Sequence, residues 1–150
     1  MAAVRTATVT WQGSLAEGSG SVSAGTSGLF TDLPVSWGSR TEEADGRTSP
    51  EELLAAAHAA CFAMAFSADL GRAGYTPEEL HVEAEVTFDK PEDGGWTVTA
   101  SALTVLGHVH GITPDEFDRI AEGTRDGCPI SRALAGNVEL SVEATLDSDG

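Results

Sequence analysis

The first third of the chain carries short alternating patterns that predict strands joined by loops. Apolar and polar residues alternate over residues 6–12, with the period of two that is typical of a strand with one apolar face. Gly and Ser dominate residues 13–28, which indicates a turn and a second, edge-like strand around residues 21–24. We expect residues 31–48 to form an irregular loop, and a loop of this length is usually functional or mobile.

A long apolar helix is predicted next. Ser49 can cap it, Pro50 suits the first helical position because its missing N–H would be unpaired there, and Glu52 completes a capping box. Residues 53–66 are apolar nearly all round the helix. A helix without a polar face is usually buried, so we expect a buried central helix that ends near residues 71–74.

The second half of the chain predicts a hairpin, a helix and a last strand. Residues 82–88 and 96–102 alternate on either side of Asp-Gly-Gly at 93–95, which is a hairpin signal. The alternation then changes phase, which indicates a bulge or burial of both faces. A second helix is expected over residues 113–126, and a final strand over residues 138–146.

This order of elements predicts the fold class. Strand pairs with helices between them, without strict alternation of strand and helix, indicate an α+β protein with a mainly antiparallel sheet, a buried central helix and a second helix. A length of 150 residues with 41% hydrophobic residues suits a single domain over residues 1–150. The tail at 147–150 is expected to fray.

Composition narrows the classes of partner and the compartment. The chain has 24 acidic and 8 basic residues, and a formal charge of -16 repels nucleic acid and anionic membrane surfaces. The N-terminal residues show no signal-peptide pattern, and we expect no stretch long enough to span a bilayer. Two cysteines without a CxxC motif do not form a secreted disulfide scaffold, so we expect a cytoplasmic protein.

The two cysteines are the candidates for chemistry. Cys61 lies three turns into the apolar helix, where most free cysteines are inert core residues and where burial suppresses the thiolate. To react, it would need a cation beside it. Cys128 lies between Gly127 and Pro129 at a helix end, an unusual place for a core cysteine. If that turn meets the long helix, Cys128 could condense with an oxidised Cys61.

The loop before the long helix contains arginines that could supply the cation that Cys61 would need. Glu51 lies in the first helical turn, where a carboxylate gains from the helix dipole, and it is available to an arginine of the preceding loop. Arg40 and Arg47 both lie in that loop, and each could equally face solvent. His58 lies one turn before Cys61, which permits metal binding by the two, although a hydrogen-bonded core histidine is the better interpretation.

Two motifs resemble a known family. The run Thr-Ser-Pro-Glu-Glu-Leu-Leu-Ala-Ala-Ala-His-Ala-Ala-Cys-Phe at residues 48–62 resembles the motif of the OsmC/Ohr family of osmotically inducible and organic hydroperoxide resistance proteins. Gly-Cys-Pro-Ile-Ser at residues 127–131 is similar to the segment around that family's second cysteine. The His-Ala-Ala-Cys-Phe form and the loop of Arg40 resemble the OsmC branch more than the Ohr branch.

The resemblance implies an activity and four site residues. Cys61 matches the peroxidatic cysteine, which attacks an organic hydroperoxide and becomes a sulfenic acid. Cys128 matches the resolving cysteine, which forms a disulfide that an external dithiol reduces. Arg40 matches the arginine that lowers the thiol pKa and stabilises the departing oxygen, and Glu51 the carboxylate that holds this arginine, with Arg47 as a competitor for the arginine's role.

The resemblance also implies partners. Family members are intertwined homodimers with two sites at the subunit interface, and the reductant would be a lipoyl protein or a thioredoxin-like protein. The implied mechanism uses no cofactor and no metal. Two other interpretations stay open: a non-catalytic binding module on the same fold, and a metal site that combines His58 with the cysteines.

Overall fold

A computed structural model describes residues 1–147, so the predicted frayed tail lies almost wholly outside the described residues. By its internal contacts the chain separates into two units, Met1–Leu53 and Leu54–Gly150. The boundary falls inside one helix, α2 (Pro50–Arg72). The single domain over residues 1–150 stays a prediction.

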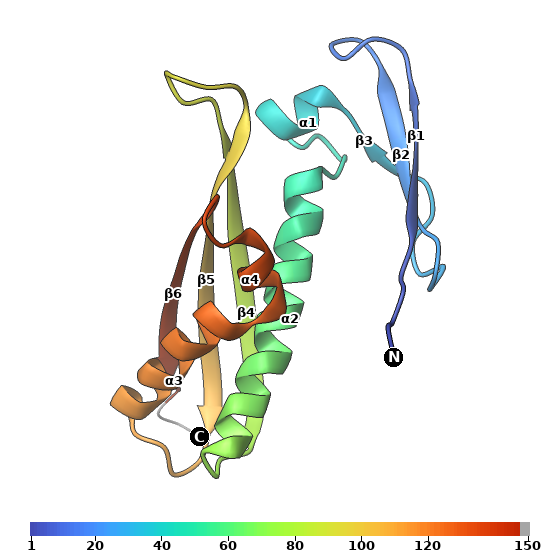
Figure 1. The fold of residues 1–150 in the computed structure, drawn as a ribbon. Helices are drawn as coiled ribbons and strands as arrows, with labels where there is room; N and C mark the ends of the chain where they lie inside the picture. The colour runs from blue at the N-terminus through green and yellow to red at the C-terminus, as the bar shows by residue number, and fades with distance from the viewer. Residues whose placement is uncertain (148–150) are drawn as a thin grey trace. The chain divides into compact units, whose positions relative to one another are not determined.

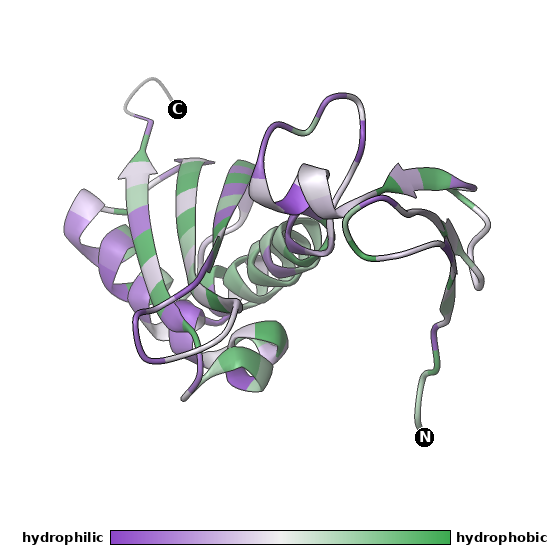
Figure 2. Ribbon diagram, turned by 90° about the horizontal axis from the view of Figure 1, so that it is seen from above, coloured by the Kyte–Doolittle hydropathy of each residue, from purple (hydrophilic) through white to green (hydrophobic). Residues whose placement is uncertain are grey.

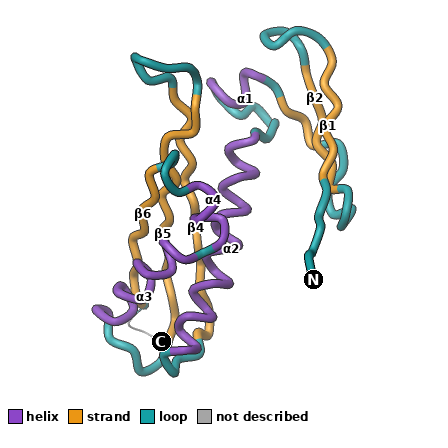
Figure 3. Tube along the Cα trace, viewed as in Figure 1, coloured by secondary structure: helices purple, strands orange, loops and turns teal. Residues whose placement is uncertain are grey.

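The first unit contains a small antiparallel sheet, as Figure 3 shows. Its strands are β1 (Ala7–Gln12), β2 (Ser19–Ala24) and β3 (Leu33–Val35), in the order β1-β2-β3. The strands predicted over residues 6–12 and around 21–24 are confirmed. β1 is exposed along its whole length in the single chain, including both the apolar and the polar positions.

The loop predicted over residues 31–48 contains two short elements instead. β3 exists because its residues pair with β2, and α1 (Trp37–Thr41) follows directly. The start of α1 is fixed by a capping box made of two serines: the Ser36 hydroxyl accepts from the Ser39 N–H, and the Ser39 hydroxyl accepts from the Ser36 N–H, both at 3.1 Å. Two serines satisfy two N–H groups that would otherwise be unpaired, so one turn of helix can form here.

Helix α2 begins where the sequence predicts it. The Ser49 hydroxyl accepts from the Glu52 N–H at 3.1 Å, which confirms the cap. The Glu52 carboxylate accepts from the Thr48 hydroxyl at 2.7 Å, which is a different partner from the Ser49 N–H that a capping box requires. At the other end, Gly74 has a φ of 97°, a left-handed conformation that favours glycine and closes the helix.

The second unit is a three-stranded sheet covered on one face by helices (Figure 1). The strands β4 (Pro77–Asp89), β5 (Thr97–Val109) and β6 (Glu139–Leu146) lie in the order β4-β5-β6. β4 and β5 form the predicted antiparallel hairpin, but β5 and β6 are parallel. A parallel pair needs a long crossover, and α3 (Pro114–Gly127) and α4 (Pro129–Leu134) provide it.

A bulge in β5 explains the change of phase in its sequence. Val98 pairs with Phe88 and Ala100 pairs with Thr87, so Thr99 is an extra residue on β5. After the bulge the buried positions are odd-numbered, beginning with Ser101. Figure 2 shows the resulting alternation of hydrophobic and hydrophilic residues along the strands. The bulge thereby places Ser101, a polar residue, on the face that packs against the helices.

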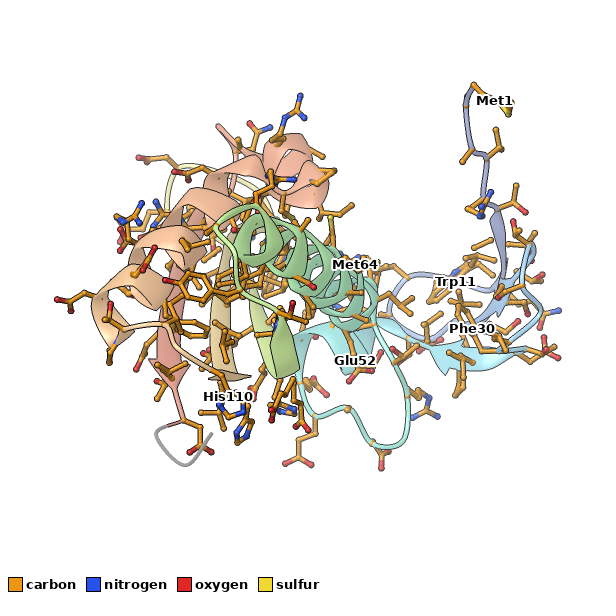
Figure 4. All side chains as sticks on the ribbon, turned by 90° about the horizontal axis from the view of Figure 1, so that it is seen from below. Met1, Trp11, Phe30, Glu52, Met64 and His110 are labelled. Carbon is orange, nitrogen blue, oxygen red and sulfur yellow. The ribbon has the colours of Figure 1, made fainter. Side chains whose placement is uncertain are left out.

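One face of α2 builds the core of the second unit. His58, Phe62, Phe66 and Leu70 recur every four residues along this face and are all fully buried. Phe66 packs on Phe117 of α3 with ring centroids 5.1 Å apart. The remaining surface of the helix is less buried in the single chain, and Met64, labelled in Figure 4, is 70% exposed. The central helix is therefore buried along one face within this chain.

The length of α2 corrects one expectation from the sequence. The helix has 23 residues and is long and apolar enough to cross a membrane by length and composition. The expectation that no stretch is long enough was therefore wrong. Core helices meet the same criterion, and the face that contains Phe62 and Phe66 packs against a sheet and another helix. We interpret α2 as a core helix.

Candidate active site

The two cysteines meet, although 67 residues separate them in sequence. The sulfur of Cys61 on α2 lies 3.3 Å from the sulfur of Cys128, and one thiol donates a hydrogen bond to the other. Both cysteines are free, with Cys61 partly exposed and Cys128 buried. The junction of α3 and α4 thus does meet the long helix, which was the condition for a reactive pair.

Cys128 is held by the ends of two helices at once. Its N–H donates to the Thr124 carbonyl at 2.9 Å, which closes α3. The same residue is the N-cap of α4, a helix that begins at Pro129. Pro129 therefore follows the end of one helix and begins the next. This double role fixes the position of the Cys128 backbone.

The two thiols differ in acidity within this chain. Burial raises the pKa of Cys61; the Ile130 N–H opposes this effect, and Cys128 adds to it. Burial also acts to raise the pKa of Cys128, but the amide and hydroxyl of Ser131, the Cys61 thiol and the Ile130 amide outweigh it and lower this pKa. The Cys128 side chain makes no capping hydrogen bond to the first turn of α4. Within one chain the negative charge is therefore better placed on Cys128.

His58 forms a buried polar link beside the thiol pair. Its Nδ1 lies 2.6 Å from the Ser101 hydroxyl on β5, and its Nε2 lies 2.8 Å from the Ser131 hydroxyl on α4. All three residues are fully buried, and burial lowers the pKa of His58. The interpretation of His58 as a hydrogen-bonded core histidine is confirmed. The sequence analysis missed Ser101 and Ser131.

Arg40 and Glu51 form an ion pair in the first unit. The Arg40 Nε lies 2.9 Å from one Glu51 oxygen, and the Arg40 Nη2 lies 2.7 Å from the same oxygen. The Glu51 side chain is 8% exposed and that of Arg40 is 29% exposed, so the carboxylate is the buried partner. The guanidinium also lies over the Trp37 ring, 5.6 Å from its centroid. Hydrogen bonds to Glu51 and an aromatic contact orient this arginine.

Arg47 has a different setting. It lies 3.6 Å from Asp45, and the two side chains are 43% and 86% exposed. This is a surface ion pair of the kind that contributes little to stability. Of the two arginines in the loop, Arg40 is the one that the structure pairs with Glu51.

An apolar pocket opens beside Arg40 within the first unit. Its volume is about 490 Å³. The walls come from all three strands and from the starts of α1 and α2, and they include Val9, Trp11, Leu15, Val35, Trp37 and Leu53. A pocket with apolar walls and one guanidinium suits a ligand that has an organic body and a polar end.

Two histidines outside the core contact carboxylates. His108 lies 3.3 Å from Asp147, and His110 pairs with Glu78. In residues 1–147 no three His, Cys, Asp or Glu side chains come together in a way that could hold a metal ion. The two ring nitrogens of His58 instead form hydrogen bonds with two serines.

The family of the chain follows from comparisons with known proteins. The family described as OsmC-like protein matches residues 42–143. The chain is 41% identical over 133 residues to Peroxiredoxin OsmC of Escherichia coli, with 89% of this chain and 91% of that protein covered. It is 30% identical over 116 residues to the organic hydroperoxide resistance protein OhrA of Bacillus subtilis, covering 77% and 79%.

A solved structure supports the fold as well. The crystal structure of the organic hydroperoxide resistance protein OhrB of Bacillus subtilis matches with a TM-score of 0.68 and 26% identity, covering 95% of this chain and 98% of that one. The family match covers most of the chain, the identity is higher to the OsmC relative than to the Ohr relatives, and the α+β fold is shared. The chain therefore belongs to the OsmC/Ohr family, on its OsmC branch.

Proposed function

We propose that this chain is a cysteine-based peroxidase that reduces organic hydroperoxides to alcohols, with Cys61 as the attacking thiolate and Cys128 as its resolving partner. The observation that carries the proposal is the 3.3 Å approach of two free thiols, one partly exposed and one buried. It is supported by 41% identity to a protein named Peroxiredoxin OsmC.

The proposed reaction has three steps. The Cys61 thiolate attacks the terminal oxygen of ROOH, the O–O bond breaks, and the alkoxide takes a proton to become ROH while Cys61 becomes a sulfenic acid. Cys128 then attacks the Cys61 sulfur, an S–S bond forms, and the hydroxide leaves as water with the thiol proton. An external dithiol, such as a lipoyl or thioredoxin-like protein, reduces the disulfide and restores both thiols.

Cys61 is the more exposed of the two thiols, which suits the attacking role. A hydroperoxide must reach the sulfur of Cys61, whereas the sulfur of Cys128 needs to reach only that of Cys61. In this account a cation lowers the pKa of Cys61, because burial raises it and the described groups that set it include no cation. Arg40 is the proposed cation, and Glu51 is the residue that positions it.

The pocket beside Arg40 is the proposed site for the organic part of the substrate. Its walls are valine, leucine and tryptophan side chains, which favour bulky organic hydroperoxides over hydrogen peroxide because affinity comes from apolar contact. A guanidinium next to apolar walls can stabilise the charge on the departing oxygen while the walls hold the alkyl group.

We further propose that two chains form a homodimer and that the site is built from both. Apolar side chains of the first unit are exposed in the single chain, with Leu29 at 87% and Val9 at 62%, and Met64 of the second unit is 70% exposed. Exposed apolar surface of this kind is typical of a face that a partner covers. A cytoplasmic location and the absence of membrane and nucleic-acid partners stay predictions.

Mixing two inactive variants tests the shared site. Arg40→Ala and Cys61→Ser should each lose peroxidase activity towards cumene hydroperoxide with a dithiol reductant. If Arg40 serves the Cys61 of the other chain, mixed dimers regain activity, because one of their two sites is intact. Activity that is fully retained in Cys61→Ser would refute the peroxidase. Mixed dimers without activity would refute only the sharing.

A further inference from the structure

The polar link through His58 ends at Ser131, one helical turn from Cys128. Ser131 is the third residue of α4, and Cys128 is the N-cap of that helix, so the two side chains lie at the same helix end. The Ser131 hydroxyl is also 2.8 Å from the His58 Nε2, and the His58 Nδ1 is 2.6 Å from the Ser101 hydroxyl. A line of buried polar groups thus runs from β5 through α2 to the start of α4, where Cys128 lies.

The line allows only two arrangements of its hydrogens while the imidazole is neutral. In one, Ser101 donates to Nδ1 and the N–H is on Nε2, which donates to Ser131 and leaves the Ser131 O–H for the Cys128 sulfur. In the other, the N–H is on Nδ1, and the Ser131 O–H is used by Nε2 and is not available to Cys128. The position of one proton on His58 therefore decides whether Cys128 receives a hydroxyl hydrogen bond.

We propose that His58 is a positioning residue that carries its proton on Nε2 and thereby directs the Ser131 hydroxyl at the sulfur of Cys128, holding the resolving cysteine as a nucleophile. The proposal rests on the proposed peroxidase function, in which Cys128 attacks the Cys61 sulfenic acid. The lowered pKa of Cys128, to which Ser131 contributes by both its amide and its hydroxyl, agrees with this arrangement. The titratable groups that face Cys128 from α2 are Cys61 and, through Ser131, His58.

The arrangement helps one step of the cycle in particular. When Cys128 attacks, the new S–S bond forms as the S–O bond of the sulfenic acid breaks, and the hydroxide that leaves takes a proton to become water. A hydrogen bond from a fixed hydroxyl stabilises Cys128 as a thiolate beforehand, so more of the protein is ready for this attack at a given pH. The line is buried from end to end, and buried polar groups of this kind are strongly sensitive to the loss of one partner.

Two amide substitutions at one position form a matched test. In His58→Gln, the amide nitrogen takes the place of Nε2 and can still donate to Ser131. In His58→Asn, the shorter side chain can reach only the Ser101 side. The thiolate of Cys128 is measured in the Cys61→Ser background, where it is the only thiol, from the pH dependence of its alkylation by iodoacetamide.

We expect His58→Asn to have about tenfold to a hundredfold less Cys128 thiolate than wild type below its pKa, the size expected for one hydrogen bond to a charged group. His58→Gln is expected to restore most of it. Ser131→Ala should match His58→Asn, and Tyr75→Phe, which removes a hydroxyl bonded to Glu116 elsewhere in the unit, controls for general loosening. Equal thiolate in the two amide variants would overturn the proposal.

A second measurement uses wild-type protein and needs no variant to fold. Nitrogen NMR of the imidazole reports which ring nitrogen carries the proton, and we expect Nε2; a proton on Nδ1 would overturn the proposal.

With cumene hydroperoxide, His58→Asn should show a higher ratio of trapped Cys61 sulfenic acid to disulfide than His58→Gln. If wild type forms neither product, the peroxidase proposal fails, whereas the alkylation and NMR results still test the role of His58.

Discussion

Oxidation of the Cys61–Cys128 pair should stabilise the chain measurably. A disulfide would close a loop of 67 residues, and the loss of chain entropy in the unfolded state for that length corresponds to about 4 kcal/mol at 25 °C. The two sulfurs already lie 3.3 Å apart and need to approach by only a little over 1 Å to reach the bond length of about 2.05 Å, so little distortion of the folded chain should offset this gain.

The assay is urea unfolding of oxidised and reduced protein, followed by circular dichroism. With the usual dependence of stability on urea for small proteins, a gain of about 4 kcal/mol moves the midpoint up by about 1–4 M. Both states are compared at one protein concentration, because dimer formation also shifts the midpoint. Cys128→Ser is the control and should unfold at the same urea concentration with and without reductant. An oxidised midpoint equal to or below the reduced one would contradict this prediction.

Three further predictions follow from single side chains. Arg40→Ala should slow the reaction of Cys61 with cumene hydroperoxide about a hundredfold in a stopped-flow assay, because the variant loses one charge-stabilising donor. Arg47→Ala should change this rate little, because Arg47 belongs to an exposed surface ion pair. Phe62→Ala, in the core on α2, should cost about 3–5 kcal/mol in urea unfolding. Burial lowers the pKa of His58 in the folded chain. The contribution of neutral His58 to stability is therefore fully present above the unfolded pKa of about 6.5 and is lost as the pH falls towards the lowered folded pKa. Between these two pKa values the free energy of unfolding should fall by up to about 1.4 kcal/mol per pH unit. His58→Gln should remove this slope, and unfolding at several pH values measures it.

The elements that the sequence predicted well are those set by local chemistry. Ser49 and Pro50 begin α2, and Thr113 begins α3, because caps satisfy N–H groups within one turn. The two-residue alternation likewise marked the β4–β5 hairpin and β6. β3 was missed because its three residues depend on pairing with β2, and the parallel pairing of β5 with β6 depends on a crossover of two helices. Both follow from contacts that are distant in sequence.

The candidate site shows the same division. The motifs identified Cys61 and Cys128, but only the fold brings two thiols together across 67 residues. Ser131 could have been found, since it is the third helical residue once Pro129 is recognised as the first. Ser101 could not, because a single serine in a strand carries no signal; it becomes significant only through the bulge that turns it towards His58.

The two-cysteine mechanism is tested most directly by treating reduced wild-type protein with a stoichiometric amount of cumene hydroperoxide and following its free thiols and its mass. We expect both thiols to disappear together and peptide mapping to find a Cys61–Cys128 disulfide within one chain. We also expect Cys61→Ser to consume no peroxide. Two free thiols after the peroxide has been consumed, or consumption by Cys61→Ser at the wild-type rate, would contradict this mechanism.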